Sequence, residues 1–433
     1  MQQRYHSVYL DKDRCKGCTN CLKRCPTEAI RVRQGRARII AERCIDCGEC
    51  IRVCSYHAKI ARTDPLSSIS AFQYKIALPA PSLFGQYKGI QSISQVIYGL
   101  KQMGFDEVFE VARGADIASM AIRERLKDKT LPRPVISAAC PAVVRLIQVR
   151  FPDLIDHLID VRQPIEIAAS LAKKEFCEKH KGVLPAEVGC FFITPCAAKM
   201  TAIRTPIGHT KSAVDGAISM LEIYGLLSSQ AKKAPVDESL VESTAFGLGW
   251  GRSGGESKSI FSDNALAVDG IENVIHVLED VENNKLRSLE FVEGNACTGG
   301  CVGGPLCFEN PYIARNAIRK LVENRIAQGD VKPPDEKILD EVPVYMDAPI
   351  LPNSVMQLDE DMLEAMRKME EMENITKELP GYDCGSCGSP TCRTFAEDIV
   401  RGFAREMDCI HKMKKQLSVM AQQMVELAQS ERE

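Results

Sequence analysis

The sequence predicts a multidomain α/β protein with a small cysteine-rich domain toward each end. Residues 70–345 alternate short β-like runs, such as YKIALPAP and VGCFFIT, with helical patterns such as SISQVIYGLKQMG and PIEIAASLAKKEFCEKH. Strands that alternate with helices are typical of layered folds with parallel strands. The second observation is that the 19 cysteines are grouped, with eight in residues 15–54 and four in residues 384–409. The remaining seven lie in the α/β region.

Length and composition narrow the possibilities further. A chain of 433 residues predicts two to four domains, and 45% hydrophobic residues suffice for a buried core. The net charge of -3, without a long basic tract, argues against nucleic-acid binding. Because the chain has no apolar run of membrane-spanning length and residues 1–9 lack a signal-peptide core, we expect a cytoplasmic protein without membrane contact. Grouped thiols in a reducing compartment are typical of metal ligands.

Composition shifts along the chain predict four segments. We expect a cysteine-rich domain at residues 1–68, the α/β domain at residues 69–348, a helix with a second cysteine-rich domain at residues 349–409, and a helical tail at residues 410–433. A segment rich in proline and acidic residues, VKPPDEKILDEVPVYMDAPILPNS, forms the link after the α/β domain.

The first cysteine-rich segment contains the same spacing twice. The repeats read Cys15-x2-Cys18-x2-Cys21-x3-Cys25 and Cys44-x2-Cys47-x2-Cys50-x3-Cys54. This is the bacterial ferredoxin spacing, in which three thiolates bind one 4Fe-4S cluster and the fourth binds the other. We therefore assign one cluster to Cys15, Cys18, Cys21 and Cys54, and the second to Cys44, Cys47, Cys50 and Cys25. Ser55 replaces the proline that follows the first repeat, and two structural zinc sites are the alternative.

Between these repeats, the segment AIRVRQGRARII alternates apolar and polar residues on both sides of Gln34-Gly35. This pattern predicts a short hairpin.

Three cysteine motifs of the α/β region follow or end β-like runs. They are VISAACP with Cys140, FFITPC with Cys196, and EFVEGNAC with Cys297, which is followed by Cys301. In α/β folds, ligands collect at the carboxyl ends of the strands. The third motif lies in a glycine-rich stretch whose backbone can approach a large inorganic group.

Other interpretations of these motifs remain open. The pair Cys297 and Cys301 is also compatible with a disulfide, half of a zinc site or a flexible loop. Cys140 and Cys196 could be core thiols, and Lys199, three residues after Cys196, could be a solvated surface residue.

Together, the three motifs resemble the signature motifs of the FeFe-hydrogenase catalytic domain, and a ferredoxin-like front end is a common accessory of that family. The resemblance implies reversible cleavage of H2 to protons and electrons. It also implies that Cys140, Cys196, Cys297 and Cys301 bind a 4Fe-4S cluster, and that Cys301 bridges to a diiron centre carrying CO, cyanide and azadithiolate.

The same resemblance assigns further roles around the diiron centre. Lys199 matches the lysine that donates to one cyanide, so Cys301 and Lys199 are the catalytic candidates. Ala80, Pro81 and Ser82 resemble the Ala-Pro-Ser segment that donates to the other cyanide. The implied partners are a redox protein such as ferredoxin and the maturation proteins that deliver the diiron centre.

Several positions depart from the pattern of catalytic members. Ala139 stands where they have a proton-relaying cysteine, and an alanine cannot transfer a proton. The other departures are Ile122, Arg125 and Ala202 at glutamate positions, and Thr194 and Asn295 at methionine positions. This combination resembles the sensory branches of the family. Our first hypothesis is therefore a slow hydrogenase that senses H2 or redox state and acts on a signalling partner.

Two alternatives accompany this hypothesis. Water or Glu124 could supply another proton path, which would leave an ordinary catalytic hydrogenase that exchanges electrons with ferredoxin. The chain could also be an iron-sulfur electron carrier or assembly scaffold that lacks the diiron centre.

The second cysteine-rich segment reads Cys384-x2-Cys387-x4-Cys392-x16-Cys409. It resembles the small 4Fe-4S domain of the corrinoid protein of the acetyl-CoA pathway and of Rnf-type electron-transfer subunits, with zinc as the alternative. The prediction for the whole chain is thus four 4Fe-4S clusters, one of them joined to the diiron centre.

Two helical segments flank this domain. In the first, Leu358, Met362, Met366 and Met369 share one side, and we expect them to pack. In the tail, apolar residues recur with the a/d spacing of a coiled coil, which predicts a homodimer, or a helix folded back on its own domain. They are Ile410, Met413, Leu417, Met420, Met424 and Leu427.

Three cysteines remain outside the predicted cluster sites. We expect Cys177 and Cys190 to be packing residues. Cys307 is expected to be either a core residue or a redox-protective thiol near the cluster loop.

Overall fold

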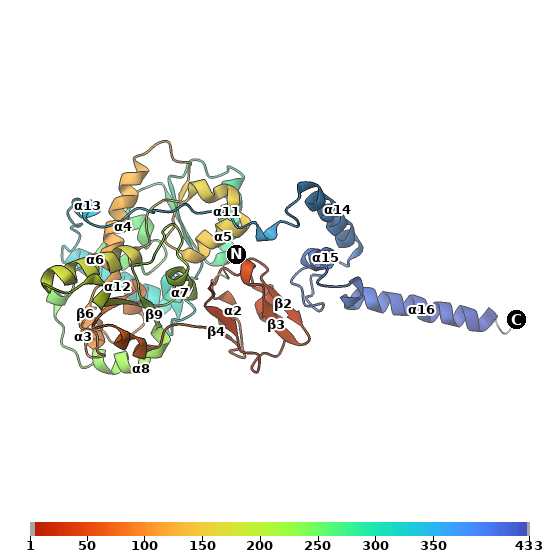
Figure 1. The fold of residues 1–433 in the computed structure, drawn as a ribbon, viewed down its shortest axis with the longest axis horizontal. Coiled ribbons are helices and arrows are strands. Elements are labelled where there is room, and N and C mark those ends of the chain that lie inside the picture. The colour runs from red at the N-terminus through yellow and green to blue at the C-terminus, as the bar shows by residue number, and fades with distance from the viewer. Residues whose placement is uncertain (1–4, 431–433) are drawn as a thin grey trace. The chain divides into compact units, whose positions relative to one another are not determined.

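The computed structural model describes residues 5–430 and divides them into two compact units (Figure 1). The larger unit contains residues 5–8, 45–48 and 61–352, and the smaller unit contains residues 9–44, 49–60 and 353–430. Each unit therefore contains segments that are distant in the sequence.

The first sheet of the larger unit has the strand order β6-β5-β8-β9, and all of its strand pairs are parallel. Its strands are β5 (Tyr74–Pro79), β6 (Glu107–Val108), β8 (Val188–Thr194) and β9 (Gly216–Ser219). Every residue of β8 is buried, as expected for an inner strand covered on both faces.

The second sheet has the order β10-β11-β7 and is also parallel. It consists of β7 (Val135–Ile136), β10 (Ala265–Asp269) and β11 (Phe291–Asn295). The runs that the sequence suggested as strands thus form strands, and the predicted α/β class with parallel strands is confirmed.

Helices cover these sheets (Figure 1). The longer ones are α3 (Ser94–Lys101), α4 (Val111–Leu126), α5 (Pro141–Arg150), α6 (Pro164–Lys179), α7 (Ala197–Arg204), α8 (Met220–Ala231), α11 (Ile271–Glu282) and α12 (Pro311–Ala327). The shorter ones are α9 (Ala245–Gly249), α10 (Gly255–Ser259) and α13 (Ile338–Glu341). One continuous hydrophobic core connects strands and helices, and it includes buried Phe84, Phe191 and Phe291.

The smaller unit begins with short elements. They are β1 (Val8–Leu10), α1 (Asn20–Lys23), β2 (Ile30–Arg33), β3 (Arg36–Ile39), α2 (Glu49–Arg52) and β4 (Lys59–Ala61), of which β1 and β4 extend by one residue into the larger unit. Strands β2 and β3 are antiparallel, which confirms the predicted hairpin. Gln34 and Gly35 both have positive φ, at 53° and 70°, as a two-residue turn of this kind requires.

Three helices complete this unit: α14 (Met362–Glu378), α15 (Cys392–Val400) and α16 (Ile410–Ser430). The prediction that Met362, Met366 and Met369 pack is wrong, because all three side chains are exposed. The face of α14 that packs instead presents Met372 and Ile375, which contact buried Phe395 of α15 in a small core.

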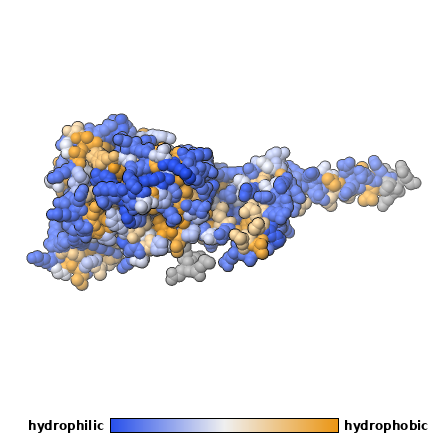
Figure 2. Space-filling view, turned by 90° about the horizontal axis from the view of Figure 1, so that it is seen from above, coloured by the Kyte–Doolittle hydropathy of each residue, from blue (hydrophilic) through white to orange (hydrophobic). Residues whose placement is uncertain are grey.

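Helix α16 extends away from the rest of its unit, and hydrophobic residues are visible along it among hydrophilic ones (Figures 1 and 2). Its predicted a/d residues are exposed, from Ile410 at 37% to Met424 at 69%. The alternative of a helix folded back on its own domain is therefore wrong. Among residues 5–430, none of the helices combines the length and apolar character that a membrane span requires.

Candidate active site

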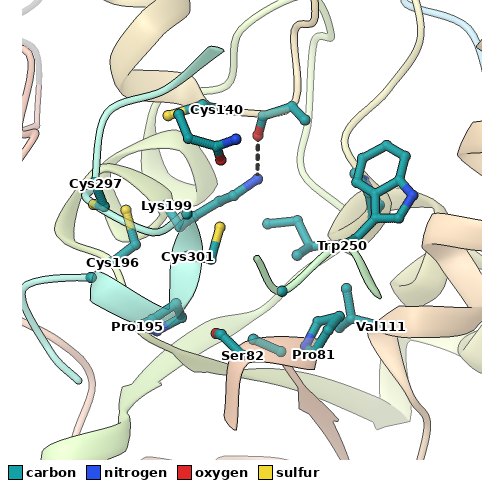
Figure 3. Close-up of a pocket in the computed structure, with 18 of the residues that line it drawn as sticks. Pro81, Ser82, Val111, Cys140, Pro195, Cys196, Lys199, Trp250, Cys297 and Cys301 are labelled. Carbon is teal, nitrogen blue, oxygen red and sulfur yellow. Dashed lines mark hydrogen bonds between the residues drawn. The ribbon is translucent and has the colours of Figure 1, made fainter. Parts of the chain in front are cut away.

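A cavity in the larger unit lies at the carboxyl ends of four parallel strands (Figure 3). Its walls include the segment after β5, the residues after β7, the residues after β8 and the loop after β11. Two of these strands, β5 and β8, belong to the first sheet, and β7 and β11 belong to the second. Backbone groups and helix starts converge at the carboxyl edges of parallel sheets, so this is the usual position of a ligand site.

The four cysteines predicted for this region all line the cavity. Cys140 directly precedes α5, Cys196 directly precedes α7, and Cys297 and Cys301 lie in the glycine-rich loop. Burial raises the pKa of Cys196 to about 12 and also raises that of Cys301, and neighbouring thiols add to both shifts. The chain thus brings four thiols from three separate motifs to one place.

Two of these cysteine loops touch through their backbones. A Cβ atom at Gly304 would lie 2.3 Å from the carbonyl oxygen of Pro195, which is far closer than two such atoms can approach. Leu306 also donates its backbone N–H to the same oxygen at 3.0 Å. Glycine is therefore needed at this position to hold the Cys301 loop against the Cys196 loop.

Lys199 extends from α7 into the cavity and is buried. Its Nζ donates to the carbonyl oxygen of Ala139 at 2.8 Å and to Oε1 of Gln163 at 2.8 Å. Figure 3 marks one hydrogen bond of Lys199 with a dashed line. Burial lowers the pKa of Lys199, while the nearby thiols Cys301, Cys140 and Cys196 act in the opposite direction. The interpretation of Lys199 as a solvated surface residue is wrong.

The predicted segment Ala80, Pro81 and Ser82 forms another wall of the cavity. Pro81 opens a 3-10 turn, Pro81–Gly85, immediately after β5. The Ser82 hydroxyl is buried and has no hydrogen-bond partner among the described residues. A buried donor without a partner is costly, so this hydroxyl fits a bound group that accepts a hydrogen bond.

Two carboxyl groups of the cavity wall were missed by sequence reasoning. Glu256 on α10 and Glu293 on β11 are buried and line the cavity. Ser137 donates to both oxygens of Glu256 at 2.8 Å, and Glu293 accepts from the backbone N–H groups of Gly254 and Ser257 at 2.9 Å. Burial raises the pKa of both carboxyls, and Glu293 adds to the shift at Glu256. The protonated form of each therefore persists to a higher pH than in an exposed glutamate.

The positions that the family resemblance matched to glutamates, Ile122, Arg125 and Ala202, contain no carboxyl group. Ile122 is buried in the core, and Arg125 forms a half-exposed ion pair with Asp160. Glu124, named above as an alternative proton carrier, is exposed, pairs with Lys127 and is not among the residues that line the cavity.

A second pocket contains the first ferredoxin-type cysteine set. Cys15, Cys18, Cys21 and Cys54 all line it, together with Lys59. The Lys59 Nζ is buried and has no hydrogen-bond partner among the described residues, so the pocket holds an uncompensated cation beside four thiols. An anionic iron-sulfur cluster would compensate this charge. The second ferredoxin-type cluster site stays a prediction, with Cys44, Cys47, Cys50 and Cys25 as its expected ligands.

A third pocket gathers Cys384, Cys387, Cys392 and Cys409. The Nε2 atom of His411, on the first turn of α16, lies 3.8 Å from the Cys384 sulfur. The long helix thus starts directly at this cysteine site.

The remaining cysteines have packing roles. Cys190 is fully buried in β8, and Cys177 packs at the edge of the core, as expected. Cys307 also packs against the core, and its thiol donates to the carbonyl oxygen of Cys301 at 3.4 Å.

Within the larger unit, residues 47–48 contact the loop that carries Cys301. A Cβ atom at Gly48 would lie 2.5 Å from Cγ of Pro305, so Gly48 and Pro305 are in close contact. Cys47, a predicted ligand of the second ferredoxin-type cluster, therefore directly precedes a residue that contacts the Cys301 loop.

These features define an α/β iron-sulfur protein with a buried thiol-lined site, and sequence comparison specifies its family. The family described as "Iron only hydrogenase large subunit, C-terminal domain" matches residues 73–265 and 261–305, more than half of the chain. A 4Fe-4S dicluster domain matches residues 7–55, and an Fe-S cluster family matches residues 379–411. The chain belongs to the iron-only hydrogenase large-subunit family.

Curated relatives agree with this assignment. The chain is 27% identical over 368 residues to the periplasmic [Fe] hydrogenase large subunit of Nitratidesulfovibrio vulgaris, which covers 69% of this chain and 86% of that one. It is 23% identical over 269 residues to iron hydrogenase 1 of Clostridium pasteurianum, covering 51% of this chain and 46% of that one. The chain thus spans less than half of the Clostridium protein.

Solved structures of the [FeFe]-hydrogenase HydA1 from Chlamydomonas reinhardtii are also similar. One of them covers 67% of this chain and 98% of its own, with 16% identity and a TM-score of 0.49.

Proposed function

We propose that this protein cleaves H2 reversibly, with low turnover, and serves as a sensor of H2 or redox state. The observation that carries the proposal is the single cavity in which Cys140, Cys196, Cys297 and Cys301 meet Lys199 and the unpartnered Ser82 hydroxyl. Four thiolates are the ligand set of a 4Fe-4S cluster, and family membership supports a diiron centre attached through Cys301.

The residues of the cavity fit the expected cofactor. When bound, the diiron centre supplies the cleavage of H2 into two protons and two electrons. Lys199 and Ser82 would hold its anionic cyanides from two walls, because both are donors in a cavity that excludes most water. The Lys199 bonds to Ala139 and Gln163 fix the direction of the lysine side chain before the cofactor arrives.

Low turnover is supported by the side chain next to Cys140. Ala139 lines the cavity where catalytic relatives have a proton-relaying cysteine, and it has no proton to give. Glu256 is the side chain that we propose as a proton carrier in its place. Its carboxyl lines the cavity and is linked through Ser137 to the backbone N–H of Ala139, since that N–H donates to the Ser137 oxygen at 3.2 Å.

The test combines infrared spectroscopy with a rate measurement. Purified protein loaded with the synthetic diiron cofactor is expected to display CO and cyanide bands and to turn over H2 far more slowly than catalytic members. If the CO and cyanide bands appear but the turnover rate equals that of catalytic members, the sensory role is rejected and the protein is an ordinary hydrogenase. Complete absence of the bands would remove the diiron centre and leave an iron-sulfur electron carrier.

We further propose that α16 pairs with the same helix of a second copy to form a homodimer, and that this coiled coil reaches a signalling partner. Its exposed apolar seam has the a/d spacing that buries such residues between two helices. The double substitution Leu417→Lys and Met424→Lys is expected to convert the dimer into a monomer in sedimentation experiments. Gln422→Lys, on another face of the helix, is the control and should leave the dimer intact. A wild-type monomer would contradict this proposal.

A further inference from the structure

The smaller unit contains a buried contact between its two cysteine-rich parts. Asp398 of α15 accepts from Nε of Arg31 on β2, at 2.9 Å to Oδ1 and 2.6 Å to Oδ2. It also accepts from Arg33 at 2.9 Å and from the Ser389 hydroxyl at 2.6 Å. The side chains of Arg31 and Asp398 are only 7% and 4% exposed. Three donor groups, from Arg31, Arg33 and Ser389, thus fix one carboxylate, which gives the contact a defined geometry.

A second buried ion pair lies beside the first. Glu397 precedes Asp398 on α15 and accepts from both terminal nitrogens of Arg43. It also accepts from Arg401 at 2.7 Å. Burying charged groups is costly unless they are paired and hydrogen-bonded, and here both conditions are met. Removing one partner of such a pair leaves an uncompensated buried charge, so separation of the two surfaces is strongly disfavoured.

The backbone of the C-terminal cysteine loop joins the hairpin directly. The Val32 N–H on β2 donates to the carbonyl oxygen of Gly388 at 2.9 Å, and Arg33 donates to the carbonyl oxygen of Cys387 at 2.9 Å. Gly388 has a φ of +82°, and a Cβ atom there would lie 1.8 Å from the Val32 oxygen. Only glycine permits this approach.

The same contact continues to the residues beside the predicted ligands. Lys23, two residues after Cys21, donates to the carbonyl oxygens of Pro390, at 2.7 Å, and Asp383. A Cβ atom at Gly385, the residue after Cys384, would lie 3.4 Å from Cδ2 of Leu22. The segment that follows Cys21 therefore touches the segments that flank Cys384.

We propose that the C-terminal cysteine site and the site of Cys15, Cys18, Cys21 and Cys54 form one fixed redox pair. Electrons pass between them across the contact of residues 21–23 with residues 383–390. Each step moves one electron, so one cubane is oxidised by one electron, the other is reduced by one, and no bond changes. The proposal rests on the cluster ligands of the proposed function, and it is independent of the diiron centre.

Helix α16 starts at the C-terminal site of this redox pair. The helix begins directly after Cys409, and its His411 lies against Cys384. A docking protein that exchanges electrons with this site, or responds to its charge, would therefore meet the C-terminal site at the start of α16. The buried pairs of Arg31 and Arg43 would keep that cluster in place while the partner binds.

The first test uses Asp398→Leu in the full chain without diiron centre. This change leaves Arg31 and Arg33 without their buried carboxylate, so we expect the contact to open. Amide hydrogen exchange should then lose protection at Val32, whose N–H is bonded to Gly388 in the docked unit. Asp359→Leu is the matched control, since it removes a partly exposed ion pair with Lys368 in the same unit and should leave Val32 protected.

The second test measures the magnetic interaction between the clusters. After chemical reduction, the EPR spectrum of wild-type protein should contain signals broadened by the interaction between the two clusters. In Asp398→Leu, at the same iron content, the C-terminal cluster should give a signal without this broadening. Arg33→Met, which removes bonds to Cys387, Ser389 and Asp398 from a partly exposed side chain, should weaken the same interaction. A wild-type spectrum that is the sum of isolated clusters would overturn the proposal. So would an undiminished interaction in both variants. Neither result depends on H2 chemistry, so failure of the proposed function would be recognised separately.

Discussion

The Glu256→Gln variant is expected to lose H2 turnover by a factor on the order of 10², while its infrared bands stay unchanged. Glutamine has the same shape as glutamate and can still accept from the Ser137 hydroxyl, so the wall of the cavity is preserved. It cannot take up and release a proton. General acid-base groups typically contribute about 10²–10⁴-fold to a rate, and the lower end suits a protein whose turnover is already slow.

Exchange of D2 with water protons, followed by mass spectrometry, measures this loss with high sensitivity. The matched control is Glu124→Gln, which makes the same chemical change on an exposed residue paired with Lys127. We expect its exchange rate to equal that of wild type. If Glu256→Gln also kept the wild-type rate, protons would have to reach the cavity without this carboxyl, and Glu256 would only position Ser137.

The sequence was sufficient to place the cysteine site because its signal is local. Each motif joins a buried strand to a loop. Strand β8 belongs to one parallel sheet and strands β7 and β11 to the other, and in each sheet the carboxyl ends of the strands lie at the edge where ligands collect. The runs before Cys140, Cys196 and Cys297 therefore predicted that the cysteines converge. Lys199 followed from the same motif as Cys196.

Glu256 and Glu293 were missed for different physical reasons. Glu256 lies on α10, a five-residue helix in a segment rich in glycine and serine, where neither periodicity nor composition distinguishes a buried carboxyl from an exposed one. Glu293 lies inside β11, between apolar residues on a strand that is buried. A charged residue in such a strand is rare unless it is paired, and this was the one available signal.

The docking of β2 on α15 could not be predicted either. Arg31 and Arg33 occur in an alternating hairpin pattern, which usually indicates a solvent-exposed face. Their partner Asp398 is more than 350 residues away in the sequence. The error at α14 has a similar cause. Its methionine stripe predicted a buried face, but Phe395 and Leu379 of the small core select the face with Met372 and Ile375.

The Lys199→Met variant is expected to bind the synthetic diiron cofactor about 10- to 100-fold more weakly than wild type. A hydrogen bond to a charged group contributes about 1.5–3 kcal/mol, and about 1.4 kcal/mol corresponds to a factor of ten in affinity. Methionine keeps the length and apolar stem of lysine, so it fills the same space between Ala139 and Gln163. The four cysteines are unchanged, and the iron content before loading should equal that of wild type.

Titration of the protein with the cofactor, followed by the infrared bands, gives the affinity directly and needs no turnover. Lys174→Met is the control, because Lys174 is a partly exposed lysine on α6 that pairs with Glu341 at 2.8 Å. If Lys199→Met binds the cofactor with the affinity of wild type, the role of Lys199 is limited to its hydrogen bonds with Ala139 and Gln163. The lysine would then act as a structural link between α7 and the Cys140 loop. If the variant binds the cofactor more weakly but has the iron content of wild type, the Lys199 charge interacts with the bound cofactor. The reason is that the cofactor is present in the titration and absent when the iron content is measured.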